Sequence, residues 1–272
     1  MRTSISIVDN VSGNVPFVLR GDFTESIKIA SQLGYDAVEM HIRDPRKIEP
    51  DRILEACNKE KIEVSSIGTG LSFSGTPLNF MSKDKEDRSK VLQRMKEYIK
   101  LAGNFNSIVI IGLLKGNIPP GGDYSTYNQR VTQMLEMCLE DAEINNVALV
   151  IEAINRYESN FLNNISETIE FVKKFSSEHI KVHIDTFHMN IEESKIAESI
   201  IKCRGVLGHV HFADNNRMYP GHGHIKFEEV IDALKKIDYK GYVAVECLAL
   251  PDPLEVAKRS LEYINRCRRC YV

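Results

Sequence analysis

Short runs of β-branched residues alternate along the whole chain with longer stretches in which apolar residues recur at the spacing of one helical face. The β-branched runs predict strands at residues 4–8, 37–41, 63–67, 107–111, 148–151, 182–184, 210–212 and 242–245. The stretches between them predict helices at residues 23–33, 50–61, 87–102, 127–145, 166–175, 194–201, 227–237 and 253–267. The chain therefore repeats a unit of one strand followed by one helix.

Strands separated by helices pair in parallel through right-handed crossovers, and about eight such units close a sheet into a barrel. We predict an α/β protein with a (β/α)₈ TIM barrel that forms a single domain over residues 1–272. An open doubly wound sheet is the second choice. It is disfavoured because no GxGxxG dinucleotide-binding pattern follows the first strand, and Gly68-Thr69-Gly70 after the third strand lacks the third glycine.

Composition narrows the choice of partners. The chain has 35 Lys and Arg against 38 Asp and Glu, a net charge of −3, which disfavours a nucleic-acid partner because such partners require clustered basic residues. The longest apolar run, at residues 107–114, is far shorter than the roughly 20 residues that span a bilayer. We therefore expect neither nucleic-acid binding nor a membrane-spanning segment.

The N-terminus and the cysteines indicate a cytoplasmic protein. Asp9 interrupts the apolar start of the chain, so residues 1–9 favour a first strand over a signal peptide. The six cysteines are scattered, as expected of reduced thiols. Cys267 and Cys270 have CxxC spacing, but no second pair accompanies them, so we interpret them as an incidental helix end and not as a zinc or redox site.

Four polar residues share one position in the predicted repeat, the carboxyl end of a strand: Glu152, Asp185, His211 and Glu246. They are about one strand–helix unit apart, so in a barrel they would meet at the mouth where catalytic residues lie. Three carboxylates at one place repel one another unless a cation lies between them. With one imidazole they suit Mn²⁺ or Co²⁺, with Mg²⁺ as a further choice, and predict one catalytic divalent ion per subunit. The alternative is that each residue only ends a strand and faces solvent.

Two more histidines lie on the same strands. Side chains two residues apart point the same way, so His183 shares a face with Asp185, and His209 shares a face with His211. Both would point into the barrel one layer below the mouth. We interpret them as buried histidines that orient the ligands and do not bind the ion themselves.

Polar residues also follow the strand ends in the predicted loops. Glu158, His188 and Arg217 come within about one turn of the first three ligands and could reach a substrate oxygen, or could be solvated loop residues. Residues 220–224 (PGHGH) predict either an anion site made of backbone N–H groups or a turn that packs on the barrel rim.

The segments that carry these residues resemble the ketose 3-epimerases, which include D-tagatose and D-psicose 3-epimerases of the xylose-isomerase-like TIM-barrel superfamily. The resemblance rests on residues 151–158 (IEAINRYE), 185–193 (DTFHMNIEE), 211–217 (HFADNNR) with 220–224, and 245–248 (VECL). Within that group the chain is most similar to the 5-keto-L-gluconate epimerase type, through residues 42–45 (IRDP), 67–70 (IGTG) and 109–113 (VIIGL).

The resemblance implies roles for individual residues. It implies that Mn²⁺ or Co²⁺ is bound by Glu152, Asp185, His211 and Glu246. It further implies that Glu152 and Glu246 are the acid and base, and that His188 and Arg217 hold the O1/O2 end of the substrate with Glu158 beside them. Members of the group are commonly homodimers or homotetramers, so the same is expected here.

The predicted chemistry is inversion at C3 of a ketose or a keto-sugar acid. The ion would chelate the C2 carbonyl oxygen and the C3 hydroxyl and stabilise the enediolate. Because the proton leaves one face and returns to the other, two carboxylates must flank the substrate, and Glu152 and Glu246 come from opposite ends of the four-strand arc. Arg43 and Lys115, expected near the mouth after the second and fourth strands, would suit an acidic substrate.

Other functions stay open at this point. An aldose/ketose or hydroxypyruvate-type 1,2-isomerase could use the same metal site. An endonuclease acting on abasic DNA would need more histidines at the mouth and a basic surface, which the net charge of −3 disfavours. A catalytically inactive sugar-binding barrel is the third alternative.

Overall fold

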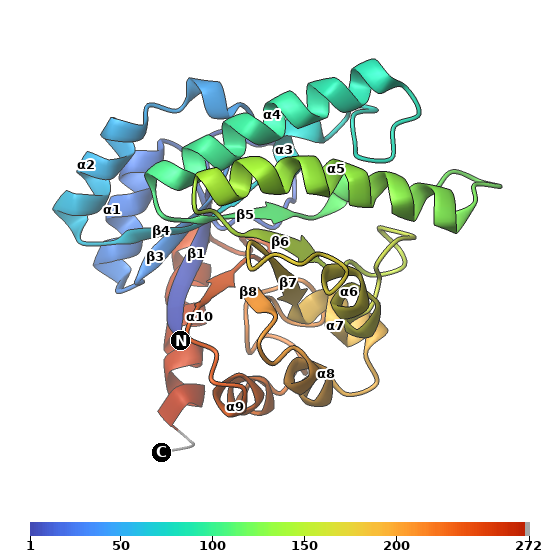
Figure 1. Cartoon of the computed structure of the whole chain (residues 1–272). Coiled ribbons are helices and arrows are strands. Elements are labelled where there is room, and N and C mark those ends of the chain that lie inside the picture. Colours follow the sequence, from blue (N-terminus) through green and yellow to red (C-terminus); the bar gives the residue numbers. More distant parts are fainter. Residues whose placement is uncertain (270–272) are drawn as a thin grey trace.

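Eight parallel strands form a closed barrel with the helices around it (Figure 1). The computed structural model describes residues 1–269. The barrel strands are β1 (Arg2–Val8), β3 (Ala37–His41), β4 (Glu63–Gly68), β5 (Ile108–Ile111), β6 (Leu149–Glu152), β7 (Ile180–Asp185), β8 (Leu207–Phe212) and β9 (Tyr242–Val245). Each strand pairs with the next along the chain, and β9 pairs with β1. A short strand, β2 (Leu19–Arg20), pairs with the end of β1.

This closure confirms the predicted TIM barrel. Arg2 is paired with Tyr242 and Ile5 with Val245, so the first and last strands are neighbours and the open doubly wound sheet is wrong. All the predicted strands are present, and their ends differ from the prediction by a few residues. The closed ring brings the carboxyl ends of all its strands to one mouth.

The helices that follow the strands are as predicted, with additions at the mouth. They are α1 (Phe23–Leu33), α2 (Pro50–Glu60), α3 (Gly70–Phe73), α4 (Lys85–Asn104), α5 (Tyr124–Ile144), α6 (Ile165–Val172), α7 (Thr186–Glu192), α8 (Ile196–Lys202), α9 (Phe227–Lys236) and α10 (Pro253–Arg269). The sequence patterns did not predict the short helices α3 and α7 or the 3₁₀ segments η1 (Pro45–Lys47) and η2 (Leu113–Lys115). These four follow the carboxyl ends of barrel strands, so they shape the mouth.

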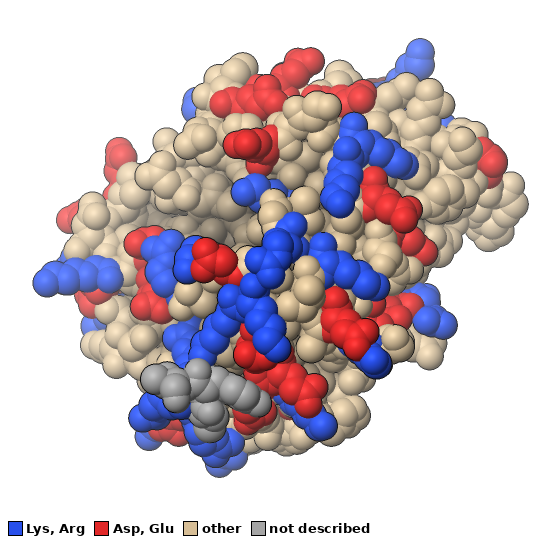
Figure 2. Space-filling model, turned by 60° about the horizontal axis from the view of Figure 1, so that its bottom comes forward, with Lys and Arg blue, Asp and Glu red and all other residues tan. Residues whose placement is uncertain are grey.

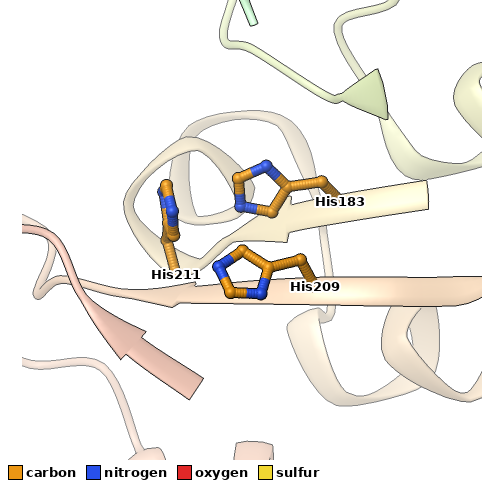
Figure 3. A group of neighbouring side chains, drawn as sticks. All are labelled: His183, His209 and His211. Carbon is orange, nitrogen blue, oxygen red and sulfur yellow. The ribbon is translucent and has the colours of Figure 1, made fainter. Parts of the chain in front are cut away.

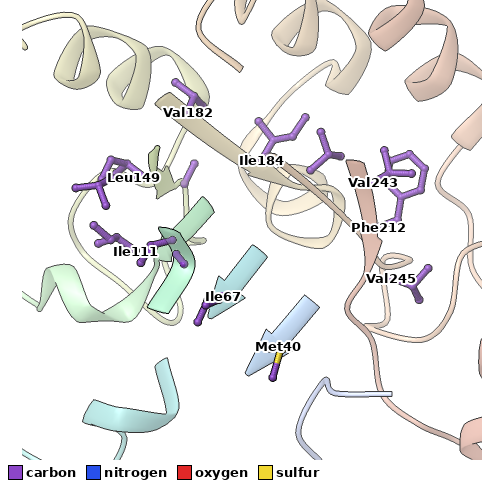
Figure 4. Close-up of a cluster of buried hydrophobic side chains, with 14 of the residues drawn as sticks. Met40, Ile67, Ile111, Leu149, Val182, Ile184, Phe212, Val243 and Val245 are labelled. Carbon is purple, nitrogen blue, oxygen red and sulfur yellow. The ribbon is translucent and has the colours of Figure 1, made fainter. Parts of the chain in front are cut away.

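The apolar core lies between the barrel and the helices. Figure 4 shows buried apolar side chains of the strands, among them Met40, Ile67 and Ile184, turned outward from the ring. These three are fully buried. Because side chains alternate along a strand, their chain neighbours point into the barrel.

The inside of the barrel is unusually polar. TIM barrels generally fill this space with branched aliphatic side chains. Here Glu39, His183 and His209 are buried inside, and Ser4 Oγ lies 2.7 Å from Ser65 Oγ. Buried polar groups cost free energy unless they are hydrogen-bonded, so this interior indicates a functional constraint.

Other structural findings bear on the predicted partners and cysteines. No helix within residues 1–269 is long and apolar enough to cross a membrane. Figure 2 shows acidic side chains lying among Lys and Arg on the face beside the C-terminal helix. The cysteines of the described chain are free and buried: Cys57, Cys138, Cys203, Cys247 and Cys267. The second cysteine of the CxxC pair, Cys270, lies outside the described residues.

Candidate metal centre

The four residues from the strand ends meet at the mouth of the barrel. Ligand atoms of Glu152, Asp185 and His211 all lie within 4.8 Å of one another. Glu246, which follows β9, has Oε2 3.4 Å from His211 Nδ1. The structure thus brings together four side chains that are far apart in the sequence.

Neighbouring backbone groups fix the orientation of two of these carboxylates, Asp185 and Glu152. Asp185 ends β7, and its Oδ1 accepts a hydrogen bond from the backbone N–H of Phe187 at 2.8 Å, which caps helix α7. Its other oxygen, Oδ2, lies 3.8 Å from His211 Nδ1. Glu152 packs over Gly112, where an added Cβ would lie 2.5 Å from Glu152 Oε2. A side chain at position 112 would therefore displace the carboxylate of Glu152.

Arg217 contacts two of the carboxylates. Its guanidinium donates hydrogen bonds to Asp185 Oδ2 and to Glu246 Oε2, and lies 4.9 Å from the centre of the Phe187 ring. The residue has a left-handed backbone with φ of 61°, and its carbonyl accepts a hydrogen bond from the Leu248 N–H at 2.8 Å. This turn directs the arginine back over the site.

His188 also faces the site, but from a helix and not from the predicted loop. It lies on α7, with Nε2 3.6 Å from Glu152 Oε1. Its Nδ1 is 2.7 Å from Asn155 Nδ2, which can only donate. Nε2 of the neutral ring therefore carries the hydrogen, and burial lowers the pKa of His188, which favours that neutral form.

Glu158 lies at the edge of this group. Its Oε1 accepts a hydrogen bond from Asn155 Nδ2 at 2.9 Å and is 3.9 Å from His188 Nδ1. The side chain is 46% exposed, so it is open to solvent as well as to His188. The three predicted substrate-binding residues are thus within reach of the four strand-end residues.

The donor set fits a divalent cation. His211 Nδ1 is buried without a hydrogen-bond partner and faces Asp185 and Glu246. An unpartnered buried nitrogen is costly, and a cation would satisfy it together with the surrounding carboxylates. One nitrogen and three carboxylates match the preferences of Mn²⁺, Co²⁺ and Mg²⁺.

The two glutamates differ in their acidity. Burial raises the pKa of Glu152 to about 8, and the charges of Glu246 and Asp185 add to this against the attraction of His211. Burial also acts to raise the pKa of Glu246, but the charges of His211 and Arg217 outweigh it and the net shift is downward. In the metal-free site Glu152 therefore keeps its proton over a pH range in which Glu246 is ionised.

Glu39 was missed by the sequence reasoning. It lies in β3, fully buried below the mouth, and its oxygens contact Nε2 of three histidines: His41, His209 and His211. The signal was present, because an acidic residue in the middle of an apolar strand is rare unless it is paired. His209 lies one layer below His211, as predicted (Figure 3).

His183, which is paired in register with His209, packs against the His211 ring from the layer below. The two ring centres are 4.1 Å apart with the rings nearly perpendicular (Figure 3). Both nitrogens of His183 are buried without a hydrogen-bond partner, and burial holds its pKa well below the usual value. The ring is therefore neutral and acts as packing against one face of His211.

Lys115 lies near the mouth, as expected, but it is buried. It ends η2 with no exposed surface, and its Nζ donates a hydrogen bond to the backbone carbonyl of Glu152. Burial lowers the pKa of Lys115 to about 8. Arg43 is exposed, and its guanidinium donates a hydrogen bond to the Leu71 carbonyl at 3.3 Å.

The glycine-rich loop is a rim turn. Asp214 accepts hydrogen bonds from the N–H groups of Gly221 and Ile225 at 2.9 and 3.1 Å, and Asn215 accepts one from His224 N–H at 3.0 Å. An added Cβ at Gly223 would lie 2.0 Å from Asn215 Oδ1. These N–H groups already donate hydrogen bonds within the loop and are not free to bind an anion. The loop is therefore a turn that packs on the barrel rim.

Comparison with known proteins agrees with this geometry. Residues 27–267 match the family model described as "Xylose isomerase-like TIM barrel". The chain belongs to this family. The xylose isomerase-like barrel accounts for nearly all of the chain, including every residue of the candidate metal centre.

Relatives of this xylose isomerase-like protein are named as sugar epimerases. It is 32% identical to D-psicose 3-epimerase of Enterocloster bolteae over 83% of this chain and 76% of that protein. It is 25% identical to 3-dehydro-D-guloside 4-epimerase of Escherichia coli over 89% and 94% of the two chains. A solved D-psicose 3-epimerase with D-tagatose from Clostridium cellulolyticum has a TM-score of 0.83 at 23% identity, with 98% and 99% of the chains covered, which shows a shared fold.

Proposed function

We propose that this protein is a metal-dependent epimerase that inverts C3 of a ketose or of a keto-sugar acid. The protein is an isomerase-class enzyme, as its relatives are named epimerases. The 3-epimerase assignment is supported by the relative of highest identity among those compared above, D-psicose 3-epimerase of Enterocloster bolteae. Convergence of Glu152, Asp185, His211 and Glu246 at the mouth is the observation on which the proposal rests.

These four side chains would hold the ion, with Mn²⁺ or Co²⁺ as the candidates of choice. The bound ion would polarise the ketone and offset the negative charge that develops when the C3 proton leaves. The protein supplies the rigid strand ends that fix the four ligands and exclude most water, since Asp185 and His211 are almost completely buried.

Glu152 and Glu246 would move the proton. Glu152 ends β6 and Glu246 directly follows β9, with β7 and β8 between them, so the two would approach the substrate from different sides. One carboxylate takes the proton from C3, and the other delivers a proton to the opposite face. Inversion needs this two-sided arrangement, whereas a shift of a proton between neighbouring carbons needs one side only.

His188 and Arg217 would hold the substrate oxygens. The Nε2–H of His188 can donate to a developing O2 charge, and Arg217 carries a permanent positive charge at the same place. Fixing O1 and O2 keeps the intermediate planar between the two glutamates. Glu158, beside His188, can accept a hydrogen bond from a sugar hydroxyl.

The test is NMR detection of solvent deuterium in a panel of 2-ketoses and keto-sugar acids incubated with the protein in D₂O. We expect deuterium at C3, loss of the reaction after EDTA treatment, and recovery with Mn²⁺ or Co²⁺. Deuterium at C1 would identify a 1,2-isomerase instead. No exchange with any substrate in the metal-loaded protein would contradict the proposal.

Inversion at C4 is the second candidate. It is favoured by the match to 3-dehydro-D-guloside 4-epimerase, which extends over 94% of that protein. The same ligand set would then bind a ketone at C3 of the sugar. In the same experiment with a 3-keto-glycoside, deuterium at C4 would select this reaction.

A further inference from the structure

Glu39 lies inside the barrel, below the candidate metal centre, and contacts side chains of both layers. Its side chain is fully buried, and one oxygen, Oε2, accepts hydrogen bonds from Ser66 Oγ at 2.6 Å and His209 Nε2 at 2.7 Å. The Nε2 atom of His211 lies between both oxygens, 2.9 Å from Oε1 and 3.0 Å from Oε2. The two contacts together fix the orientation of the His211 ring.

This contact also decides which nitrogen of His211 is free. A carboxylate can only accept hydrogen bonds, so Nε2 of His211 must carry a hydrogen. An ion can bind only the neutral ring, in which Nδ1 offers its lone pair, and this atom faces Asp185 Oδ2 at 3.8 Å and Glu246 Oε2 at 3.4 Å. Glu39 therefore selects the nitrogen that points toward the other ligands.

A second set of contacts leads from Glu39 through His41 to Glu246. His41 Nε2 is 2.9 Å from Glu39 Oε1 and 3.7 Å from Glu246 Oε1. The His41 ring packs against Phe17, with ring centres 4.1 Å apart, and against Gly68, where an added Cβ would lie 2.3 Å from Nδ1. Glu39 thus holds His41 by a hydrogen bond, and His41 packs beside Glu246 at a distance too long for a hydrogen bond.

We propose that Glu39 is a positioning residue of the metal centre, which holds His211 with Nδ1 toward the ion and supports Glu246 through His41. The inference rests on the proposed metal-dependent function and extends it to a residue that touches neither ion nor substrate. Carboxylates that hold a metal-binding histidine typically change metal affinity by about 10- to 100-fold when they are replaced.

The test measures Mn²⁺ binding to metal-free protein by titration calorimetry. We expect E39Q to bind Mn²⁺ about 10- to 100-fold more weakly than the wild type. E39D keeps the charge and should bind more tightly than E39Q. S4A is the matched control, because Ser4 is equally buried inside the barrel and hydrogen-bonded to Ser65 at 2.7 Å, and it reaches Glu39 only indirectly, through Ser65 and Ser66. It should bind Mn²⁺ like the wild type.

A purely structural role would give a different result. In that case E39Q and S4A would lose thermal stability without metal, but neither would change Mn²⁺ affinity. For a positioning role, saturating Mn²⁺ should restore most of the kcat of E39Q, and the Mn²⁺ concentration for half-maximal activity should rise. If E39Q does not fold, the Mn²⁺ affinity of E39D is compared with that of S4A instead. If neither Glu39 variant folds, Glu39 has a structural role and the proposal is overturned.

Failure of the inference can be told from failure of the proposed function. Equal Mn²⁺ affinity of wild type and E39Q overturns the role of Glu39 alone. Tight Mn²⁺ binding by the wild type, weaker binding by E39Q and no epimerisation of any substrate would support the positioning role and overturn the epimerase. A wild-type protein that binds no divalent ion would overturn both.

Discussion

Asp185 caps the helix that carries His188. Asp185 Oδ1 accepts the hydrogen bond from the N–H of Phe187 at 2.8 Å, and its Oδ2 lies 3.9 Å from His188 Nε2. Strand β7 thus passes directly into α7, and the first turn of the helix returns His188 to the end of its own strand. One aspartate thereby aims a candidate ligand atom and also a candidate substrate-binding side chain.

Replacement of Glu152 or Glu246 by glutamine is expected to remove epimerisation. Glutamine keeps the shape of the side chain but cannot accept or deliver the proton, and positioned proton transfer contributes on the order of 10²- to 10⁴-fold to a rate. E152Q and E246Q should each still exchange the C3 proton of one epimer only, because each keeps the base on one face. NMR in D₂O with each purified epimer measures this.

Metal content is the control for these variants, because both glutamates are also candidate ligands. Atomic emission analysis at saturating Mn²⁺ separates loss of the ion from loss of the base. Full epimerisation by either variant with its ion bound would contradict the two-base scheme.

Arg217 is expected to be more than a positive charge. Its planar group reaches Asp185 and Glu246 at once, and lysine cannot reproduce such a fork. Loss of a hydrogen bond to a charged group costs about 1.5–3 kcal/mol, so R217K should lower kcat/KM by about 10- to 100-fold, with a lower kcat because the developing O2 charge is less well stabilised.

Arg46 provides the matched control for R217K. Two nitrogens of Arg46 donate hydrogen bonds to the carboxylate of Asp44, at 2.9 and 2.8 Å. Unlike that of Arg217, the Arg46 side chain is 58% exposed. Exposed ion pairs contribute little, so R46K should leave kcat/KM unchanged. Equal effects of the two substitutions would argue against a role of Arg217 at the site.

The sequence was sufficient to predict the barrel and the meeting of the four strand-end residues. Both follow from the regular repeat of strand and helix along the chain. The repeat predicts the fold, and Glu152, Asp185 and His211 each lie at the carboxyl end of a strand within it. Parallel strands that close into a barrel must bring these positions together.

The interior of the barrel could not be predicted in the same way. Contact of Glu39 with His209 and His211 depends on which strands face each other across the barrel, and on the register shift between Val38 and Glu39. Helix α7 was missed because it begins at the residue after a strand, without the intervening loop that marks a helix start in sequence.

A side chain at position 68 is expected to destabilise the protein. An added Cβ would lie 2.3 Å from His41 Nδ1, and the ring cannot move away easily because it is held by Phe17 and Glu39. Overpacking of this kind typically costs about 1–3 kcal/mol, so G68A should lower the free energy of unfolding in urea by that amount.

Gly70 gives the control for this substitution. It lies two residues away, with no atom within 4 Å of an added Cβ. G70A should leave the free energy of unfolding close to that of the wild type. If G68A were as stable as G70A, the close approach of His41 to β4 would be wrong, and the support it gives Glu246 would be lost with it.

Metal-free protein should lose stability as the pH rises from 5 to 8, in part because of Glu152. Burial raises the pKa of this carboxyl to about 8 in the folded protein, against 4.5 for an ordinary glutamate. The folded state therefore holds a proton that the unfolded chain releases, so the contribution is fully present below about 4.5 and is lost as the pH approaches 8. Urea unfolding of wild type and E152Q in EDTA should show a stability difference that shifts in favour of E152Q by a few kcal/mol at most over this range. Parallel pH profiles of the two proteins would show that Glu152 is already ionised in the metal-free site.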